Sequence, residues 1–252
     1  MTPASAAVPE WRAAWFAPWR AEAQALLARR STGLPAHEAA NALAWAPVRF
    51  VPQAALPAGE PYERFIFDTV QVPMREGWHD FFNALVWMRL PRAKRRLNAL
   101  QAAEIARDGV RATRGPVRDA ATVFDENAVL LHAPDALWQA LAARRWGELF
   151  GPLRPLWGQA RLLVFGHAAL EKLVAPYKSI TGHAWRVAPP FDAAGDLRAL
   201  DDWLARDLTP ERLAAKPFVP LPLLGVPGWW PGNEAPAFYD DARVFRHVRP
   251  PR

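Results

Sequence analysis

The sequence has no cysteine among its 252 residues. This excludes disulfide frameworks, zinc or iron–sulfur sites built on cysteine, and thiol nucleophiles. Serine is scarce too, since only Ser5, Ser31 and Ser179 occur, and no Gly-x-Ser-x-Gly motif surrounds Ser179. We therefore expect no serine hydrolase of that kind.

Long hydrophobic runs are also missing. The nearest, residues 162–175, is broken by His167, Glu171 and Lys172, and a spanning helix needs roughly 18 apolar residues. The first ten residues lack the basic region and the apolar core of a signal peptide. We expect a protein without a membrane partner and, because cysteine is absent, with a cytoplasmic location.

The common nucleotide and metal motifs do not occur, including the glycine-rich phosphate loops, His-Glu-x-x-His and the EF-hand loop. The remaining composition is that of an ordinary globular protein, with 51% hydrophobic and 22% charged residues. The 26 prolines and 14 glycines stay below the share typical of disordered chains.

The chain is basic, with a net charge of +6 and 27 arginines against four lysines. One interpretation is an acidic partner such as nucleic acid or a phosphate-bearing ligand. The other is a GC-rich genome, whose codons favour arginine, alanine, proline and tryptophan. The even spread of the charges along the chain favours the second interpretation.

No repeat or flexible linker divides the chain, so we predict a single domain. It comprises an N-terminal helical arm (1–60), a core (61–190) and a C-terminal helix with a tail rich in proline and aromatic residues (191–252).

Apolar spacing predicts most of the secondary structure. The predicted helices span 21–30, 37–45, 78–89, 91–107, 134–145, 168–174 and 195–207, and the predicted strands span 161–165 and 183–187. Two β-prone runs in 121–132 flank a turn-like Asp-Glu-Asn, which predicts a hairpin, whereas 47–61 reads as an extended loop. These elements predict an α+β fold, a helix-rich globular domain around a small, mainly antiparallel sheet.

Polar residues within apolar segments are the candidates for chemistry. On the helix from Trp78, His79 and Asn83 share a face, and Asp80 lies in the first turn. A carboxylate beside an imidazole suits acid–base work or metal ligation. Asp80 also suits a purely structural role at a helix N-terminus.

A second candidate is the basic segment 91–98. Cations at the start of a helix oppose the helix dipole, so a partner must offset them. Arg92, Lys94 and Asn98 are the predicted anion-binding residues, and an ordinary solvated surface is the alternative.

Two further segments carry acids. Asp125 and Glu126, at the predicted hairpin tip, supply either turn geometry or oxygens for a metal or a general base. His167 begins a helix directly after a strand and a glycine, with Glu171 one turn later. These two residues can share a hydrogen bond or one metal ion, or they can be a core histidine and a solvent-facing acid.

The C-terminal loop contains Trp229 and Trp230 between prolines and glycines. Such rings can stack on a base or a sugar. They can equally fill the core as aromatic bulk.

Four segments together resemble a proteobacterial family known only as domain of unknown function 3025. They are residues 77–87, 124–127, 165–172 and 225–231. The resemblance extends from about Trp78 to Phe245 and implies no activity. In that family's pattern histidine often follows Asn98-Ala-Leu, where this chain has Gln101.

The leading hypothesis is one polar cleft built from seven residues, namely His79, Asp80, Asn83, Asp125, Glu126, His167 and Glu171. It would perform acid–base or metal-assisted hydrolytic chemistry on a small or phosphate-bearing substrate, with a divalent metal as the candidate cofactor. The competing hypothesis is a non-catalytic module that binds nucleic acid or a protein through the basic helix and the tryptophan loop.

Overall fold

The computed structural model describes residues 7–109 and 115–247. Contacts along the chain divide it into two compact units, which we call the sheet unit and the helical unit. The sheet unit comprises Met1–Pro18, Asn127–Ala193 and Phe218–Arg252, and the helical unit comprises Trp19–Glu126 and Ala194–Pro217. The predicted single domain, with its arm and tail, is not tested by this division and stays a prediction.

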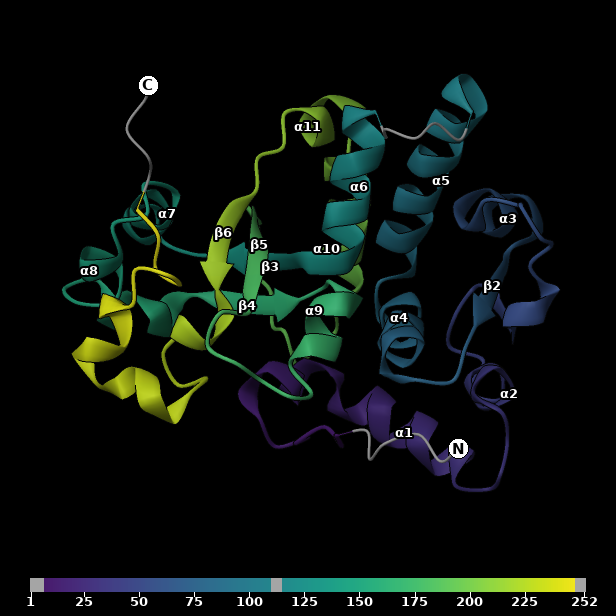
Figure 1. Ribbon diagram of the computed structural model, residues 1–252, viewed down its shortest axis with the longest axis horizontal. Helices are drawn as coiled ribbons and strands as arrows, with labels where there is room; N and C mark the ends of the chain where they lie inside the picture. Colours follow the sequence, from purple (N-terminus) through teal and green to yellow (C-terminus); the bar gives the residue numbers. More distant parts are fainter. Residues whose placement is uncertain (1–6, 110–114, 248–252) are drawn as a thin grey trace. The chain divides into compact units, whose positions relative to one another are not determined.

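The sheet unit is built on a four-stranded sheet in the order β4-β3-β5-β6 (Figure 1). Its strands are β3 (Ala128–His132), β4 (Arg161–Val164), β5 (Thr181–Arg186) and β6 (Val219–Pro222). The β3–β4 and β5–β6 pairs are antiparallel, whereas β3 and β5 are parallel. β3 and β5 are therefore the two inner strands, and the first four residues of β3 are buried.

Short helices surround this sheet. They are α7 (Asp135–Ala142), α8 (Trp146–Leu149) and α9 (His167–Lys172), and the 3-10 helices Arg154–Gln159, Leu223–Gly225, Pro231–Glu234 and Pro236–Asp240. The C-terminal segment is anchored by Phe245, which is 1% exposed and contacts Trp146, Phe150 and Tyr239.

The helical unit contains eight α-helices among the described residues. They are α1 (Arg20–Arg30), α2 (Ala36–Asn41), α3 (Tyr62–Thr69), α4 (Trp78–Arg89), α5 (Pro91–Asp108), α6 (Pro116–Asn127), whose last residue falls in the sheet unit, α10 (Arg198–Asp207) and α11 (Pro210–Ala214). β1 (Arg49–Pro52) and β2 (Gln71–Met74) form a parallel pair, with the 3-10 helix Gln53–Ala55 after β1. A further 3-10 helix, Ala14–Trp19, runs into α1. In Figure 1, α5 lies between α6 and α3, and it also packs against α4 and α10.

The start of α5 shows how the chain offsets its crowded cations. Pro91 occupies the first turn, where a missing N–H costs nothing. Asp201 of α10, only 3% exposed, accepts hydrogen bonds from the backbone N–H groups of Arg92 (2.9 Å) and Ala93 (2.8 Å). A buried carboxylate thus supplies the negative charge that this helix N-terminus favours.

The predicted hairpin at 121–132 is wrong. Its first half is the end of α6, and only its second half is a strand, β3. Val117, Ala120, Ala121 and Phe124 lie buried at helical spacing, and this packing overrides the β-propensity of the intervening residues.

The fold is helix-rich α+β with small sheets, as predicted. Two of the three strand pairs in the four-stranded sheet are antiparallel, whereas β1 and β2 pair in parallel. The predicted loop 47–61 contains β1, and the helix predicted for 37–45 ends at Asn41, since Ala44 adopts a left-handed conformation (φ 54°). Among the residues that the structure describes, no helix combines the length and the apolarity needed to cross a bilayer. The cytoplasmic location stays a prediction.

Candidate functional site

Polar side chains line the facing sides of four helices in the helical unit. On α5 and α6 they recur at intervals of four and three residues, the spacing of a single helix face. We call this set the polar seam, and it comprises Tyr62, Glu63, Asn83, Lys94, Asn98, Gln101, Arg118, Thr122 and Asp125.

The seam is centred on an ion pair between Lys94 and Asp125. The Lys94 ammonium donates to Asp125 Oδ1 at 2.6 Å, and the two residues are only 4% and 8% exposed. The ammonium also lies 5.4 Å from the centre of the Trp87 ring. Desolvating two charges costs several kcal/mol per ion, so a buried pair is a poor source of stability compared with apolar packing.

Glu63 faces this ion pair from α3. Its carboxylate Oε2 accepts a hydrogen bond from Asn98 Nδ2 at 2.6 Å, and the same amide donates to the Glu63 carbonyl at 2.8 Å. Burial raises the pKa of Glu63, and the negative charge of Asp125 raises it further, against the opposing effects of Lys94 and Asn98. Glu63 therefore holds its proton to a higher pH than an exposed glutamate does.

Tyr62 and Asn83 form the α3–α4 side of the seam. The Asn83 amide donates to the Tyr62 hydroxyl at 3.4 Å, and that hydroxyl lies 3.3 Å from the Pro73 carbonyl. Burial raises the pKa of Tyr62 well above its ordinary value, with smaller contributions from the charges of neighbouring carboxylates. Asn83 is 5% exposed, and its Oδ1 has no hydrogen-bond partner among the described residues.

The far end of the seam is uncharged where α5 meets α6. Gln101, 5% exposed, lies with its Oε1 3.2 Å from the Thr122 hydroxyl, which is also 2.9 Å from the Arg118 carbonyl. An amide here fills the polar site without adding a titratable group near neutral pH.

Asp80 has structural partners. It is 6% exposed and accepts hydrogen bonds from the backbone N–H of Arg75 (2.7 Å) and from the Arg75 guanidinium (3.0 and 3.3 Å). These bonds connect the end of β2 to the first turn of α4. His79, beside it, and Glu126, in the last turn of α6, are half-buried.

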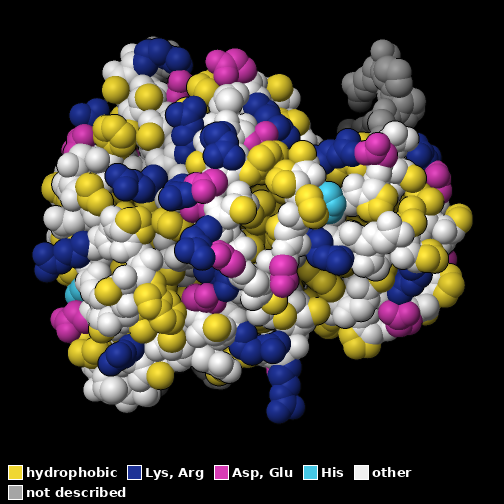
Figure 2. All heavy atoms as spheres, turned by 180° about the vertical axis from the view of Figure 1, so that it is seen from behind, with side chains coloured by type: hydrophobic (Ala, Val, Ile, Leu, Met, Phe, Trp, Pro, Cys, Tyr) yellow, Lys and Arg dark blue, Asp and Glu magenta, His cyan; other side chains and the backbone are white. Residues whose placement is uncertain are grey.

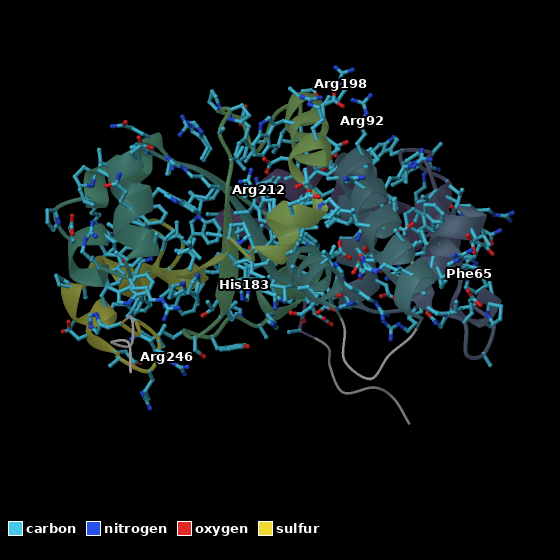
Figure 3. All side chains as sticks on the ribbon, turned by 90° about the horizontal axis from the view of Figure 1, so that it is seen from above. Phe65, Arg92, His183, Arg198, Arg212 and Arg246 are labelled. Carbon is cyan, nitrogen blue, oxygen red and sulfur yellow. The ribbon has the colours of Figure 1, made fainter. Side chains whose placement is uncertain are left out.

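Each of the three predicted anion-binding residues contacts an acid of the same unit. Lys94 pairs with Asp125 and Asn98 with Glu63. Arg92 pairs with Asp202 on the outer edge of the unit, where Figure 3 labels Arg92 near Arg198. Anion binding by this set stays a prediction.

His167 and Glu171 belong to the sheet unit. β4 leads through Gly166 into α9, as predicted, and the N–H groups of Phe165 and Gly166 both donate to the Ala128 carbonyl, at 3.0 and 2.9 Å. His167 opens α9 and is 6% exposed, whereas Glu171 is exposed. Their share in the site proposed from the sequence is untested.

The two loop tryptophans are half-buried. The ring of Trp229 lies 6.2 Å from that of Trp15, and Trp230 lies against Gly232 within its own loop. Buried Asn233 holds the loop by donating to the carbonyls of Leu224 (2.8 Å) and Val226 (2.7 Å). These contacts favour the interpretation of the loop as core filling.

Residues 7–109 and 115–247 offer few side-chain groupings for metal ligation. No group of three or more histidine, aspartate or glutamate side chains there is arranged to hold an ion. The seam offers carboxylates, amides and one ammonium, which is a set suited to proton transfer and hydrogen bonding.

Sequence reasoning missed Tyr62 and Glu63. Pro61 before them and the buried pair Phe65 and Ile66 after them mark a helix start with one apolar face. That signal was available in the sequence, but nothing local indicates that Glu63 faces α5.

Comparison with protein families gives one match. A family model described as a protein of unknown function (DUF3025) matches residues 48–249. This confirms the family resemblance of the four segments, while the proteobacterial source stays a prediction. No curated protein and no solved structure matches the chain.

Proposed function

The chain belongs to DUF3025, a family of proteins of unknown function, and we propose that it is an enzyme performing acid–base, hydrolytic chemistry on a small substrate at the polar seam. The observation that carries this proposal is the Lys94–Asp125 ion pair beside a second carboxyl, Glu63, whose pKa is raised. Perturbed titratable groups gathered in one place are characteristic of catalytic sites.

The two carboxyl groups of the seam have unlike environments. Lys94 donates directly to Asp125, whereas Glu63 receives only an amide hydrogen bond. Environments that separate the protonation of two acids are how enzymes assign acid and base roles. In the proposed reaction Glu63 donates or accepts the proton, and the Lys94–Asp125 ion pair lies beside it.

Asn83 and Tyr62 complete the proposed site as orienting groups. An unsatisfied buried acceptor costs about 1–3 kcal/mol, which makes the free Oδ1 of Asn83 a candidate hydrogen-bond acceptor for a substrate donor. Tyr62 stays protonated, and its hydroxyl accepts from Asn83 and donates to the Pro73 carbonyl. We include His79, Asp80 and Glu126 as neighbours that position this region, and the proposal does not depend on His167 or Glu171.

The test is a hydrolysis assay of the whole chain on p-nitrophenyl phosphate, bis(p-nitrophenyl) phosphate and p-nitrophenyl acetate across a pH series. Glu63→Gln should abolish the rate that depends on one titrating group, because an amide cannot exchange the proton. Glu60→Gln, an exposed change three residues away, is the control and should leave the rate and its pH profile unchanged.

A second measurement needs no substrate. In a ¹³C NMR titration of the glutamate carboxyls, the signal lost in Glu63→Gln should titrate above the ordinary glutamate range. Titration of that signal at the ordinary value would contradict the proposal. So would hydrolysis that the Glu63→Gln variant retains in full.

Substitutions of the Lys94–Asp125 ion pair give a third test of the proposal. Replacing both partners, Lys94→Met with Asp125→Leu, should leave the protein folded, since apolar residues often replace a buried pair without loss of stability. Lys94→Met alone should destabilise by about 3–5 kcal/mol because the buried Asp125 carboxylate loses the ammonium that donates to it. A folded, fully active double variant would show that the pair has no catalytic role.

The competing hypothesis of a nucleic-acid-binding module has weaker support. It relied on the cations of α5, but Lys94 is buried with Asp125, Arg92 pairs with Asp202, and Arg96 Nε donates to the Leu208 carbonyl at 2.9 Å. These contacts engage three of the four cations in residues 92–96, and the fourth, Arg95, is exposed.

A further inference from the structure

The sheet unit contains a pocket of about 420 Å³, within the range of small-molecule sites. It lies between the end of α7, the β5–β6 pair and the C-terminal segment. Nine residues line it: Arg144, Trp146, Ser179, Thr181, Pro220, Pro222, Arg243, Val244 and Arg246.

All the charged side chains that line this pocket are positive. Arg144, Arg243 and Arg246 contribute three guanidinium groups, and none of the lining residues is acidic. The one acidic contact is Asp241, whose Oδ1 lies 3.3 Å from Arg243 Nε and which also faces Lys178 at 3.5 Å. The three positive charges around the pocket repel one another, and a bound anion would offset this repulsion.

Much of the hydrogen-bonding capacity of these arginines is unused. The Arg144 guanidinium has no hydrogen bond to a described residue. Towards the described residues, the Arg246 guanidinium uses only its Nε, which donates to the Arg243 carbonyl at 2.9 Å. The terminal N–H groups of a guanidinium form a fork that matches two oxygens of a phosphate or carboxylate.

The backbone that bears these arginines is held in place by contacts within the unit. Trp146 Nε1 donates to the Arg246 carbonyl at 3.0 Å, and Phe245 between Arg243 and Arg246 is buried. Arg144 has a left-handed backbone (φ 52°), a conformation that costs a residue other than glycine roughly 1 kcal/mol. Figure 3 shows Arg246 on the C-terminal segment of this unit.

The residues of the opposite wall restrict the kind of ligand that fits the pocket. Pro220 and Pro222 are apolar and come from the same face of β6, since they pair with His183 and Thr181 of β5. The Ser179 hydroxyl adds a donor beside the arginines, whereas the Thr181 hydroxyl donates to the Ser179 carbonyl at 3.1 Å. The pocket therefore combines a cationic end with an apolar wall.

We infer that this pocket binds a small phosphate monoester, with the phosphate held by Arg144, Arg243 and Arg246 and the organic group against Pro220 and Pro222. Three guanidinium groups match a dianion with three terminal oxygens, whereas one fork satisfies a carboxylate. The site is independent of the polar seam, which lies in the other unit.

The experiment is calorimetric titration of the full chain with phenyl phosphate, and with inorganic phosphate and benzoate as comparison ligands. Phenyl phosphate should bind saturably and more tightly than either comparison ligand, because only it satisfies both the cations and the apolar wall. Arg144→Gln and Arg246→Gln should each weaken binding roughly tenfold, the effect of losing one charge-assisted pair.

The matched control is Arg145→Gln. Arg145 is adjacent in sequence, but it is exposed and pairs with Glu148 outside the pocket lining. It should bind phenyl phosphate like the parent chain, and circular dichroism confirms that each variant is folded. Absence of saturable binding, equal binding of benzoate, or full affinity in both pocket variants would overturn the assignment.

Discussion

Glu63 shows how one buried carboxyl couples stability to pH. Its pKa in the folded protein is raised above the ordinary value of 4.5, chiefly by burial. The folded state therefore holds the proton more tightly than the unfolded state. The stabilisation is complete below the ordinary value and is lost as the pH rises through the folded-state value.

The Glu63→Gln variant should thus gain stability relative to the parent chain as the pH rises from 4 to 8. The gain should be on the order of 1 kcal/mol, because the amide keeps an oxygen for Asn98 without a buried charge. Urea unfolding at several pH values measures it. A difference between the two chains that does not vary with pH would contradict the assigned direction.

Individual residues of the seam were partly predictable from the sequence. Asn83, Lys94, Asn98 and Asp125 stood out as polar groups inside apolar segments, and they do lie in the seam. The partners could not be predicted. Which carboxylate meets Lys94, and that Glu63 meets Asn98, depends on how α3 and α6 pack on α5, a property of no single segment.

Among the elements, β5 depends on a close approach at Gly182. A Cβ added there would lie 2.4 Å from Val129 Cγ2 and 2.9 Å from Leu223 Cδ2. Gly182→Ala should therefore lower the free energy of unfolding by about 1–3 kcal/mol, as expected for overpacking against a stiff, buried valine. Thermal or urea unfolding measures the effect.

The control for this prediction is Gly158→Ala. Gly158 is exposed, and a Cβ there meets no atom within 4 Å. Its stability should change by no more than about 0.5 kcal/mol. Equal effects of the two substitutions would show that β5 tolerates a wider spacing than its contacts indicate.

Helices with a strong apolar period and the strands β4 and β5 were predicted, whereas β1 and β2 were not. α4, α5 and α10 match their predicted ranges closely because apolar spacing and Pro91 mark them locally. β1 and β2 were missed, since four-residue strands interrupted by proline lack a local signal and exist through their parallel pairing. α6 was misread because β-prone residues occupy its last turns.

At the scale of the whole chain, the basic residues are spread along the sequence. On the face drawn in Figure 2, lysine and arginine side chains alternate with acidic and hydrophobic ones. Many of the basic residues are in ion pairs, such as Lys216 with Asp119 at 2.6 Å. A net charge of +6 distributed in this way gives little focused attraction for nucleic acid.

We therefore expect no measurable binding of a short DNA duplex at physiological salt in a fluorescence-anisotropy titration. Weak binding at low salt should disappear as salt is added, as for any non-specific phosphate contact. Tight binding that persists at physiological salt would instead favour the binding-module hypothesis.

The chain passes four times between its two units, so each unit is completed by residues made long after its first ones. During synthesis the helical unit is incomplete until Ala194–Pro217 has been made. The sheet unit is incomplete until the segment that begins at Phe218 has been made. Until then Asp201 has not reached the start of α5 and β5 lacks its outer neighbour. Neither half can be released as an autonomous fragment by one cut, and a premature stop between β5 and β6 leaves the β5 edge without its partner strand.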